Sequence, residues 1–348
     1  MFLLATFVVV WILIKIDVDV YTNYLNATFY FYQVVPLFIN TGNLRTKPVI
    51  LSLIRIFNLE GFGAGSLSGF CVLESFTPLD KQFLNYCFPF FAFVCVFVVF
   101  MLGQRFRRFN FNSSNFVHVV IFIMIWAYGD IVRVTIQILK YTVIGDTKYV
   151  FVEADEVYFG SRKHCIYAPI ACIVAFLALL FPVMLAFPSP ILARLPRLKA
   201  IFDNKYFFKD NSVSQLFVSY YFVCRIVLSI IGTFLFTERL GTQQTALTCV
   251  SVTVYLVFLS VMPYDEDYNY LNYFDGVVLF LLTSVALITN RLGGLLPGHP
   301  SIIMYNIILD IVFMLPFLWV LGNLLMKAIR CLRTFYMKRR ARKYHISY

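Results

Sequence analysis

The chain has 348 residues, of which 60% are hydrophobic and only 14% are charged, and it contains 39 Phe and 22 Tyr. A soluble domain of this length does not need so many aromatic residues for one core. The composition therefore excludes an ordinary soluble protein and predicts an all-α fold, a polytopic transmembrane helix bundle.

Apolar segments of about 20 residues are long enough to cross a hydrocarbon core about 30 Å thick as helices. Two weaker segments come first, namely Phe2–Ile14, which is short, and Tyr21–Ile39, which is rich in Tyr and Asn. The seven stronger segments are Phe83–Leu102, Val117–Leu139, Ile166–Phe187, Leu216–Phe236, Thr245–Met262, Gly276–Thr289 and Ile302–Met326. We therefore expect about nine spans.

These segments divide the chain into a short first transmembrane segment (1–20), a multipass bundle (21–330) and a basic tail (331–348). A chain that begins directly inside a span is expected to be either a truncated sequence or the end of a larger protein. We favour the second interpretation, in which an ectodomain precedes the bundle.

Positive charge predicts the orientation, because cytosolic loops carry an excess of Lys and Arg. The tail from Lys327 holds eight Lys or Arg, so we expect a cytosolic C-terminus. Nine spans then give an extracellular N-terminus, with the Asn58–Lys81 and Tyr141–Cys165 loops outside the cell and the Arg194–Lys209 loop in the cytosol. The plasma membrane is the expected location.

The net charge of +11 follows from the same asymmetry, so nucleic acid is not an expected partner. Membrane lipids are the expected partners. A basic cluster directly after a span is attracted to anionic headgroups by about 1 kcal/mol per charge. Cations are the other expected partners, if the bundle conducts.

Cysteine and histidine spacing suggests little chemistry. Cys71 and Cys165 lie in predicted external loops, and Cys87 lies near the external end of its span, so Cys71 can pair with Cys165 or with Cys87 in an oxidising compartment. The chain has no HExxH, GxSxG, Walker or CxxC pattern. We therefore expect no catalytic residue, no metal and no cofactor.

Four charged residues lie inside predicted spans: Asp130, Arg133, Arg225 and Asp310. Asp130 and Arg133 are three residues apart and share a helix face, where they can neutralise each other. Such charges cost several kcal/mol unless they face the bundle interior or water. They indicate either an ion or lipid pathway or a set of interhelical salt bridges that fixes packing, and the sequence leaves both open.

The stretch VMPYDEDYNYLNYFDGVVLF (Val261–Phe280) interrupts the apolar sequence with a polar turn. We expect Pro263 to end one span and Asn272 to be the N-cap of the next, with Asp275 at the third helical position near the positive end of the helix dipole. The turn itself is a predicted cytosolic hairpin with Tyr264, Asp265, Glu266 and Asp267. The three acids are expected to face either the basic Arg194–Lys209 loop or cations at a pore mouth.

Three features occur in a recognisable order along the second half of the chain. They are Tyr220, Tyr221 and Arg225 in one span, Gln243 and Gln244 at the start of the next, and then the break with Pro263, Tyr264, Asn272 and Asp275. This order resembles the membrane region of the TRP-like family first described in fungi, which includes flavin-carrier and polycystin-like proteins. Together with FYQVVPLF, IRIFNLE and FDNKYFFKDN, it also resembles the C-terminal multipass region of large Cys-rich or EGF-like surface proteins of early animals and protists.

The resemblance implies a bundle of about nine spans behind an external N-terminal domain, whose Cys-rich repeats do not occur in this chain. It implies a cation channel, or a channel-like or lipid-linked membrane protein. The alternative is the membrane-anchoring region of a cell-surface receptor or adhesion protein without transport activity of its own.

The orientation can be tested with the two glycosylation sequons. Asn26-Ala27-Thr28 lies in a predicted span and Asn112-Ser113-Ser114 in a predicted cytosolic loop, so both should stay unmodified in a eukaryotic host. An endoglycosidase mobility shift measures this, and a glycan on Asn112 would reverse the predicted orientation.

Overall fold

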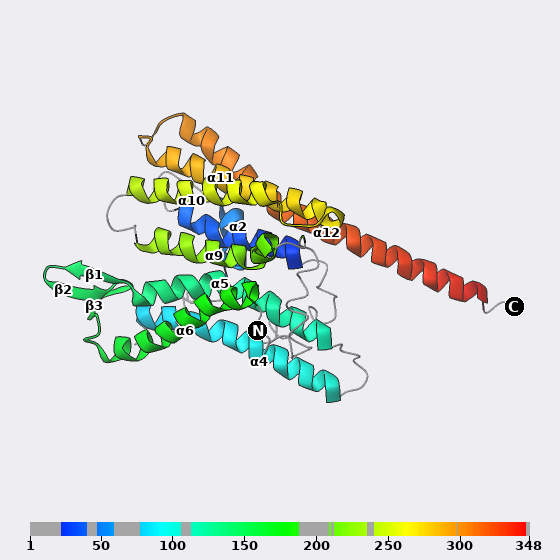
Figure 1. Cartoon of the computed structure of the whole chain (residues 1–348), viewed down its shortest axis with the longest axis horizontal. Coiled ribbons are helices and arrows are strands. Elements are labelled where there is room, and N and C mark those ends of the chain that lie inside the picture. The colour runs from blue at the N-terminus through cyan, green and yellow to red at the C-terminus, as the bar shows by residue number, and fades with distance from the viewer. Residues whose placement is uncertain are drawn as a thin grey trace.

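The structure is a computed structural model that describes residues 22–39, 47–58, 77–105, 113–187, 209, 212–234, 240–296 and 298–345. These residues form a helix bundle with one small sheet at one end (Figure 1). The helices are α2 (Thr22–Ile39), α3 (Pro48–Phe57), α4 (Pro78–Arg105), α5 (Ser113–Leu139), α6 (Arg162–Ala186), α9 (Ser212–Phe234), α10 (Leu240–Val261), α11 (Asn269–Gly293) and α12 (Ser301–His345). The expected Phe2–Ile14 span lies outside the described residues.

Six of the described helices are long and apolar enough to cross a membrane. The apolar stretches are Pro78–Leu102, Phe122–Leu139, Arg162–Met184, Gly241–Val261, Glu266–Gly293 and Ser301–Asn323. In α9 the apolar stretch is shorter, Ser219–Thr233. These helices are compatible with the predicted helical bundle and with a multipass membrane protein. The predicted count of about nine spans is not confirmed.

α2 is the central helix of the bundle. It contacts α3, α5, α9, α11 and α12, and Figure 1 shows it in dark blue inside the bundle alongside α9 and α11. All nine residues from Ala27 to Val35 are buried, so every face of this part of the helix is covered by protein. A helix that is apolar nearly all round is typical of such a position.

One polar side chain holds α2 against α5. Gln33 donates from Nε2 to the backbone oxygen of Trp126 at 2.6 Å, inside the apolar part of α5. The approach is close because residue 129 is glycine. A Cβ added at Gly129 would lie 2.7 Å from Gln33 Oε1 and 3.1 Å from Gln33 Cβ, closer than carbon atoms normally come.

A three-stranded antiparallel sheet covers the end of the bundle at which α5 finishes. Its strands are β1 (Tyr141–Ile144), β2 (Thr147–Val150) and β3 (Glu153–Val157), in the order β1-β2-β3. The expected external loop at this place is thus partly a sheet, and the fold is not entirely helical. The strands are short and mostly exposed, so they lack the apolar alternation that predicts a strand.

The sheet is fixed to the starts of α4 and α6. Glu153 Oε2 in β3 accepts a hydrogen bond from the backbone nitrogen of Leu79 in α4. Lys163 Nζ in α6 lies 2.8 Å from Asp80 Oδ2 in α4, and the rings of Phe83 and Tyr167 stack with centroids 4.1 Å apart. α4 and α6 therefore begin side by side at the sheet end.

α3 is a further helix that the sequence did not predict. It is ten residues long, with Ile50 and Ile54 buried and Val49 and Leu51 exposed. Asn58 follows α3 and donates from Nδ2 to the backbone oxygen of Tyr32 at 2.7 Å. α3 is thereby attached to the middle of α2.

The contact between α2 and α5 predicts a specific cost of substitution. Gly129→Ala should lower the free energy of unfolding by about 1–3 kcal/mol, because the new methyl group forces Gln33 to move and lose its bond to Trp126. Thermal unfolding of the purified protein in detergent measures the change.

The matched control is Gly241→Ala in the first turn of α10, where nothing lies within 4 Å of an added Cβ. Alanine is favoured over glycine in a helix by about 0.5–1 kcal/mol, so this variant should be as stable as the original protein or slightly more stable. Equal effects of the two substitutions would contradict the proposed close contact.

Candidate functional site

A buried carboxylate of α11 is joined to α9 by a tyrosine hydroxyl. Asp275 in α11 has no exposed surface, and its Oδ2 accepts hydrogen bonds from the hydroxyls of Tyr221 at 2.8 Å and Tyr264 at 2.7 Å. Its other oxygen, Oδ1, has no hydrogen-bond partner among the described residues. No Lys or Arg of the described residues forms a salt bridge with it.

Tyr264 is suited to this role because it stays protonated. Burial, and next the nearby charge of Asp275, raise the pKa of the Tyr264 hydroxyl well above its ordinary value. The hydroxyl therefore donates to the carboxylate over the whole physiological pH range.

A buried cation lies four residues beyond Tyr221 on the same helix. Arg225 is 1% exposed, and its Nη2 donates to the backbone oxygen of Asn26 at 3.2 Å and to Asn26 Oδ1 at 3.3 Å. Its Nε and Nη1 have no hydrogen-bond partner in the part of the chain that the structure describes. The guanidinium instead lies over the rings of Tyr30 and Phe222, 5.6 Å and 5.2 Å from their centroids.

Tyrosine rings join the two charged groups. The ring of Tyr30 lies 4.9 Å from that of Tyr221, centroid to centroid, so the sequence of contacts runs from Arg225 through Tyr30 and Tyr221 to Asp275. The opposite charges are thus neighbours in the core without forming an ion pair with each other. We call these four residues, with Tyr264 and Asn26, the polar core.

Residues that carry the family resemblance lie together in this place. Tyr221, Arg225, Tyr264 and Asp275 are members of the polar core, and Asn272 lies next to it. These residues share a site although they are up to 54 residues apart in the sequence, whereas Gln243 and Gln244 lie elsewhere, against Gly232 and Phe38.

The turn before α11 is held by Asn272, whose role differs from the predicted N-cap. α11 begins at Asn269 and follows a short 3₁₀ turn, η5 (Glu266–Tyr268), so Asn272 lies within the helix. Its Oδ1 accepts from the backbone nitrogen of Tyr264 at 3.1 Å, and its Nδ2 donates to the Tyr264 oxygen at 3.1 Å. The N-cap prediction was wrong because the Asn272 side chain bonds to the Tyr264 backbone on the other side of the turn. These two bonds place the Tyr264 hydroxyl next to Asp275.

The remainder of the hairpin agrees with a polar turn between two helices. α10 ends at Val261, two residues before the buried Pro263. The three acids Asp265, Glu266 and Asp267 are all exposed. Of the basic loop expected to face them, the structure describes only Lys209, whose backbone nitrogen donates to Pro263 oxygen at 2.9 Å.

The other predicted intramembrane charges each form an ion pair, one within α5 and one between α12 and the residue before α3. Arg133 Nη2 lies 2.6 Å from Asp130 Oδ1 on the same face of α5. Asp310 in α12 lies 3.3 Å from Nζ of Lys47, just before α3. Lys47 was not among the predicted partners, because nothing in the local sequence places it beside α12.

The predicted disulfide stays a prediction. Cys165 is a free, exposed thiol whose Sγ lies 3.2 Å from the backbone oxygen of Phe159, and Cys71 lies outside the described residues. No group of three or more His, Cys, Asp or Glu suited to a metal ion occurs in the described ranges.

Side chains from neighbouring helices cap the C-terminal ends of α2 and α9. Gln244 Nε2 donates to the Phe38 oxygen at 3.4 Å, and Gln243 Nε2 donates to the Gly232 oxygen at 2.6 Å. Lys140 Nζ donates to the backbone oxygen of Thr233. The last four carbonyls of a helix lack partners within it, so each of these donors satisfies a group that the helix itself leaves unpaired.

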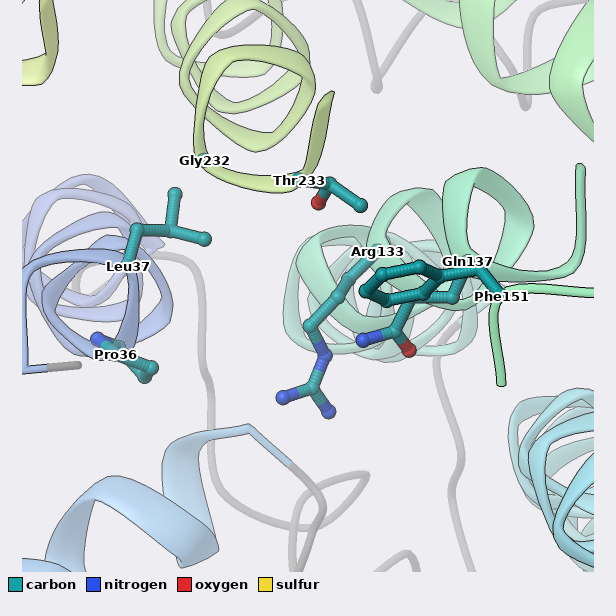
Figure 2. A pocket seen from close by; sticks show the side chains of 7 residues that line it. All are labelled: Pro36, Leu37, Arg133, Gln137, Phe151, Gly232 and Thr233. Carbon is teal, nitrogen blue, oxygen red and sulfur yellow. The ribbon is translucent and has the colours of Figure 1, made fainter. Parts of the chain in front are cut away.

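A cavity of about 210 Å³ lies at the same end, between α2, α5 and α9. Figure 2 shows Arg133 and Gln137 extending from α5 into the space opposite Pro36 and Leu37. Gly232 and Thr233 of α9 and Phe151 of the β2–β3 turn complete its lining.

Two cationic side chains, Arg133 and Lys140, lie at or beside this cavity, and nearby negative groups offset their charge. Lys140 is buried beside the ring of Phe151, at 3.8 Å from its centroid, and burial lowers the pKa of its ammonium group. Each helix C-terminus carries about half a negative charge, and α2, α5 and α9 all end here. Together with Asp130 they balance Arg133 and Lys140, so the described residues give the cavity no surplus positive charge to attract an anion.

Sequence reasoning missed Asn26, Tyr30 and Lys140 as members of these networks. The sequence carries only a weak signal for these three residues. A polar side chain in an apolar segment needs a hydrogen-bond partner, but the sequence does not show which helix supplies that partner. Gln243 and Gln244 were noticed for the resemblance, and their capping role follows from the fold.

Comparison with protein-family models, curated proteins and solved structures found no match. The class of protein therefore follows from the helix bundle alone. It is an apolar helical protein compatible with several membrane spans, and its buried polar core keeps atoms without a hydrogen-bond partner among the described residues.

The polar core predicts the effect of removing the tyrosine hydroxyls. Tyr221→Phe and Tyr264→Phe should each lower the free energy of unfolding by about 1–3 kcal/mol, because each removes a donor from the buried carboxylate of Asp275. Chemical denaturation in detergent measures the loss.

Tyr273→Phe provides the control, because Tyr273 lies on the same helix but is 67% exposed. Its effect should stay within about 0.5 kcal/mol. If all three variants behaved alike, the hydroxyls would not be holding Asp275.

Proposed function

We propose that this chain is a TRP-like multipass membrane protein that conducts cations or regulates their movement. The observation that supports this most is Asp275, a fully buried carboxylate that has no salt-bridge partner among the described residues. Buried acids within membrane spans are costly and rare, and they mark ion pathways and proton relays.

The turn before α11 adds to this support. Asp265, Glu266 and Asp267 are exposed directly before the helix that carries Asp275. Exposed acids raise the local concentration of cations, as acidic rings do at the mouths of cation channels. An entering cation would therefore pass from an exposed acidic turn towards a buried carboxylate.

The described arrangement suits a closed state. The segment Ala27–Val35 is buried at the centre of the bundle, and Arg225 places a positive charge over Tyr30, whose ring packs against Tyr221. A cation could pass only if α2 or Arg225 moved.

A second candidate function is membrane anchoring for a receptor or adhesion protein. The ion pairs Asp130–Arg133 and Lys47–Asp310 support it, because they neutralise three of the four charges that suggested a pathway. Paired charges fix helix packing without any transport.

Flux measurements separate the two candidates. The purified protein is reconstituted into liposomes, and potassium and calcium flux are recorded with ion-sensitive dyes. We expect flux above that of empty liposomes and about a tenfold reduction in Asp275→Asn, corresponding to about 1.4 kcal/mol, because asparagine keeps the shape and loses the charge.

Asp146→Asn, in the exposed β1–β2 turn, is the matched control and should keep the original flux. Flux no greater than that of empty liposomes would favour anchoring. Flux that is unchanged in Asp275→Asn would remove the observation on which the conduction proposal depends.

A further inference from the structure

The last helix extends far beyond the part of it that suits a membrane. α12 runs unbroken from Ser301 to His345, whereas its candidate span ends at Asn323. Residues 324–345 add about 33 Å at 1.5 Å per residue. Figure 1 shows α12 continuing past the ends of the neighbouring helices.

This extension emerges at the end of the bundle that holds the acidic turn. The ring of Trp319 lies 5.8 Å from that of Phe274, centroid to centroid, and Phe274 is in the second turn of α11. The residues that follow Asn323 therefore leave the bundle near the start of α11, and the extension keeps the direction of the span.

The extension carries charge of one sign only. Residues 324–345 contain no Asp or Glu. They contain eight Lys or Arg, namely Lys327, Arg330, Arg333, Lys338, Arg339, Arg340, Arg342 and Lys343.

It also exposes large apolar side chains. Ile329 is 63% exposed and Met337 is 61% exposed, and Arg333 between them is exposed as well. Residues four apart on a helix lie on one face, so these three form a continuous exposed stripe. Leu325 and Met326, 55% and 52% exposed, lie one turn before Ile329, so the exposed apolar side chains group around Ile329 and do not occur singly.

Distance argues against the lipid headgroups as the partner of this helix. The basic cluster from Lys338 to Lys343 begins about 22 Å beyond Asn323 along the helix. Electrostatic attraction is screened over about 8 Å at physiological ionic strength. Lys327 lies within this screening distance of a membrane surface near Asn323 and Arg330 lies close to its limit, whereas the cluster from Lys338 to Lys343 lies well beyond it.

Like charge argues against a second copy of the chain. Two parallel extensions would bring basic residues together with no acid to separate them, which destabilises a helix pair. A partner must instead supply negative charge and an apolar surface together.

We propose that residues 324–345 of α12 form a docking helix for an acidic protein that encloses a basic helix in an apolar groove. Helix-in-groove recognition uses apolar anchors spaced by three or four residues, which the exposed Leu325 and Ile329 supply, with Met337 eight residues further along the helix. The cluster Lys338–Lys343 supplies the charge complementarity, which steers the encounter and sets its salt dependence.

Binding of an acidic groove protein tests this. The full chain is placed in nanodiscs of phosphatidylcholine, which has no net charge, and titrated with fluorescent calcium-loaded calmodulin at 150 mM salt. We expect saturable binding. K338E/R339E/R340E should weaken it at least tenfold, and Ile329→Asn with Met337→Asn should do the same.

Lys148→Glu is the matched control, because it reverses an exposed cation in β2 at the opposite end of the bundle, and binding should not change. Absence of binding, or equal binding by all variants, would overturn the proposal. Loss of binding when 30% phosphatidylserine is added would overturn it as well, because the helix would then lie on the membrane. The readout is binding alone, so it does not depend on whether the protein conducts ions.

Discussion

α2 is enclosed by other helices, and the remaining structure depends on how its polar groups are satisfied there. In hydrocarbon there is no water to pair with a polar side chain or an open carbonyl, so each partner must come from the protein. Gln33 bonds to α5, Tyr32 donates to the Phe313 oxygen in α12, and Asn26 accepts from Arg225 in α9. Each of these three polar side chains thereby joins α2 to a different neighbouring helix.

The same requirement accounts for the helix ends. Carbonyls at the ends of α2 and α9 accept from Gln243 and Gln244 of α10 and from Lys140, which directly follows α5. Ordinarily such carbonyls are hydrated or capped by glycine turns. Here the capping donors also bind helices to one another, so the ends and the centre of the bundle are fixed by one kind of contact. Satisfaction is incomplete among the described residues, because Arg225 and Asp275 retain buried atoms without a hydrogen-bond partner, and so do the amide oxygens of Gln33, Gln243 and Gln244.

Much of the bundle could be predicted from apolar length alone, because a span needs a minimum number of apolar residues whatever surrounds it. Asp130 and Arg133 were readable as neighbours because both lie on one helix at a spacing of three. The pairing of Asp310 with Lys47 was not readable, since it joins segments 263 residues apart, a separation that leaves no local pattern. The start of α11 was misplaced for a related reason: Asn272 resembles an N-cap in its local sequence, but its amide is used by the Tyr264 backbone on the other side of the turn.

α12 contains Pro316, and its position gives the helix a mechanical property. Proline has no backbone N–H, so the Val312 carbonyl loses its usual partner and the helix is weakened at that turn. On one side of the turn, Phe313 is tied to α2 and Asp310 to Lys47; on the other side, Trp319 rests on Phe274. Bending of α12 is therefore easiest at Pro316, between the contacts that hold Asp310 and Phe313 and the contact that holds Trp319.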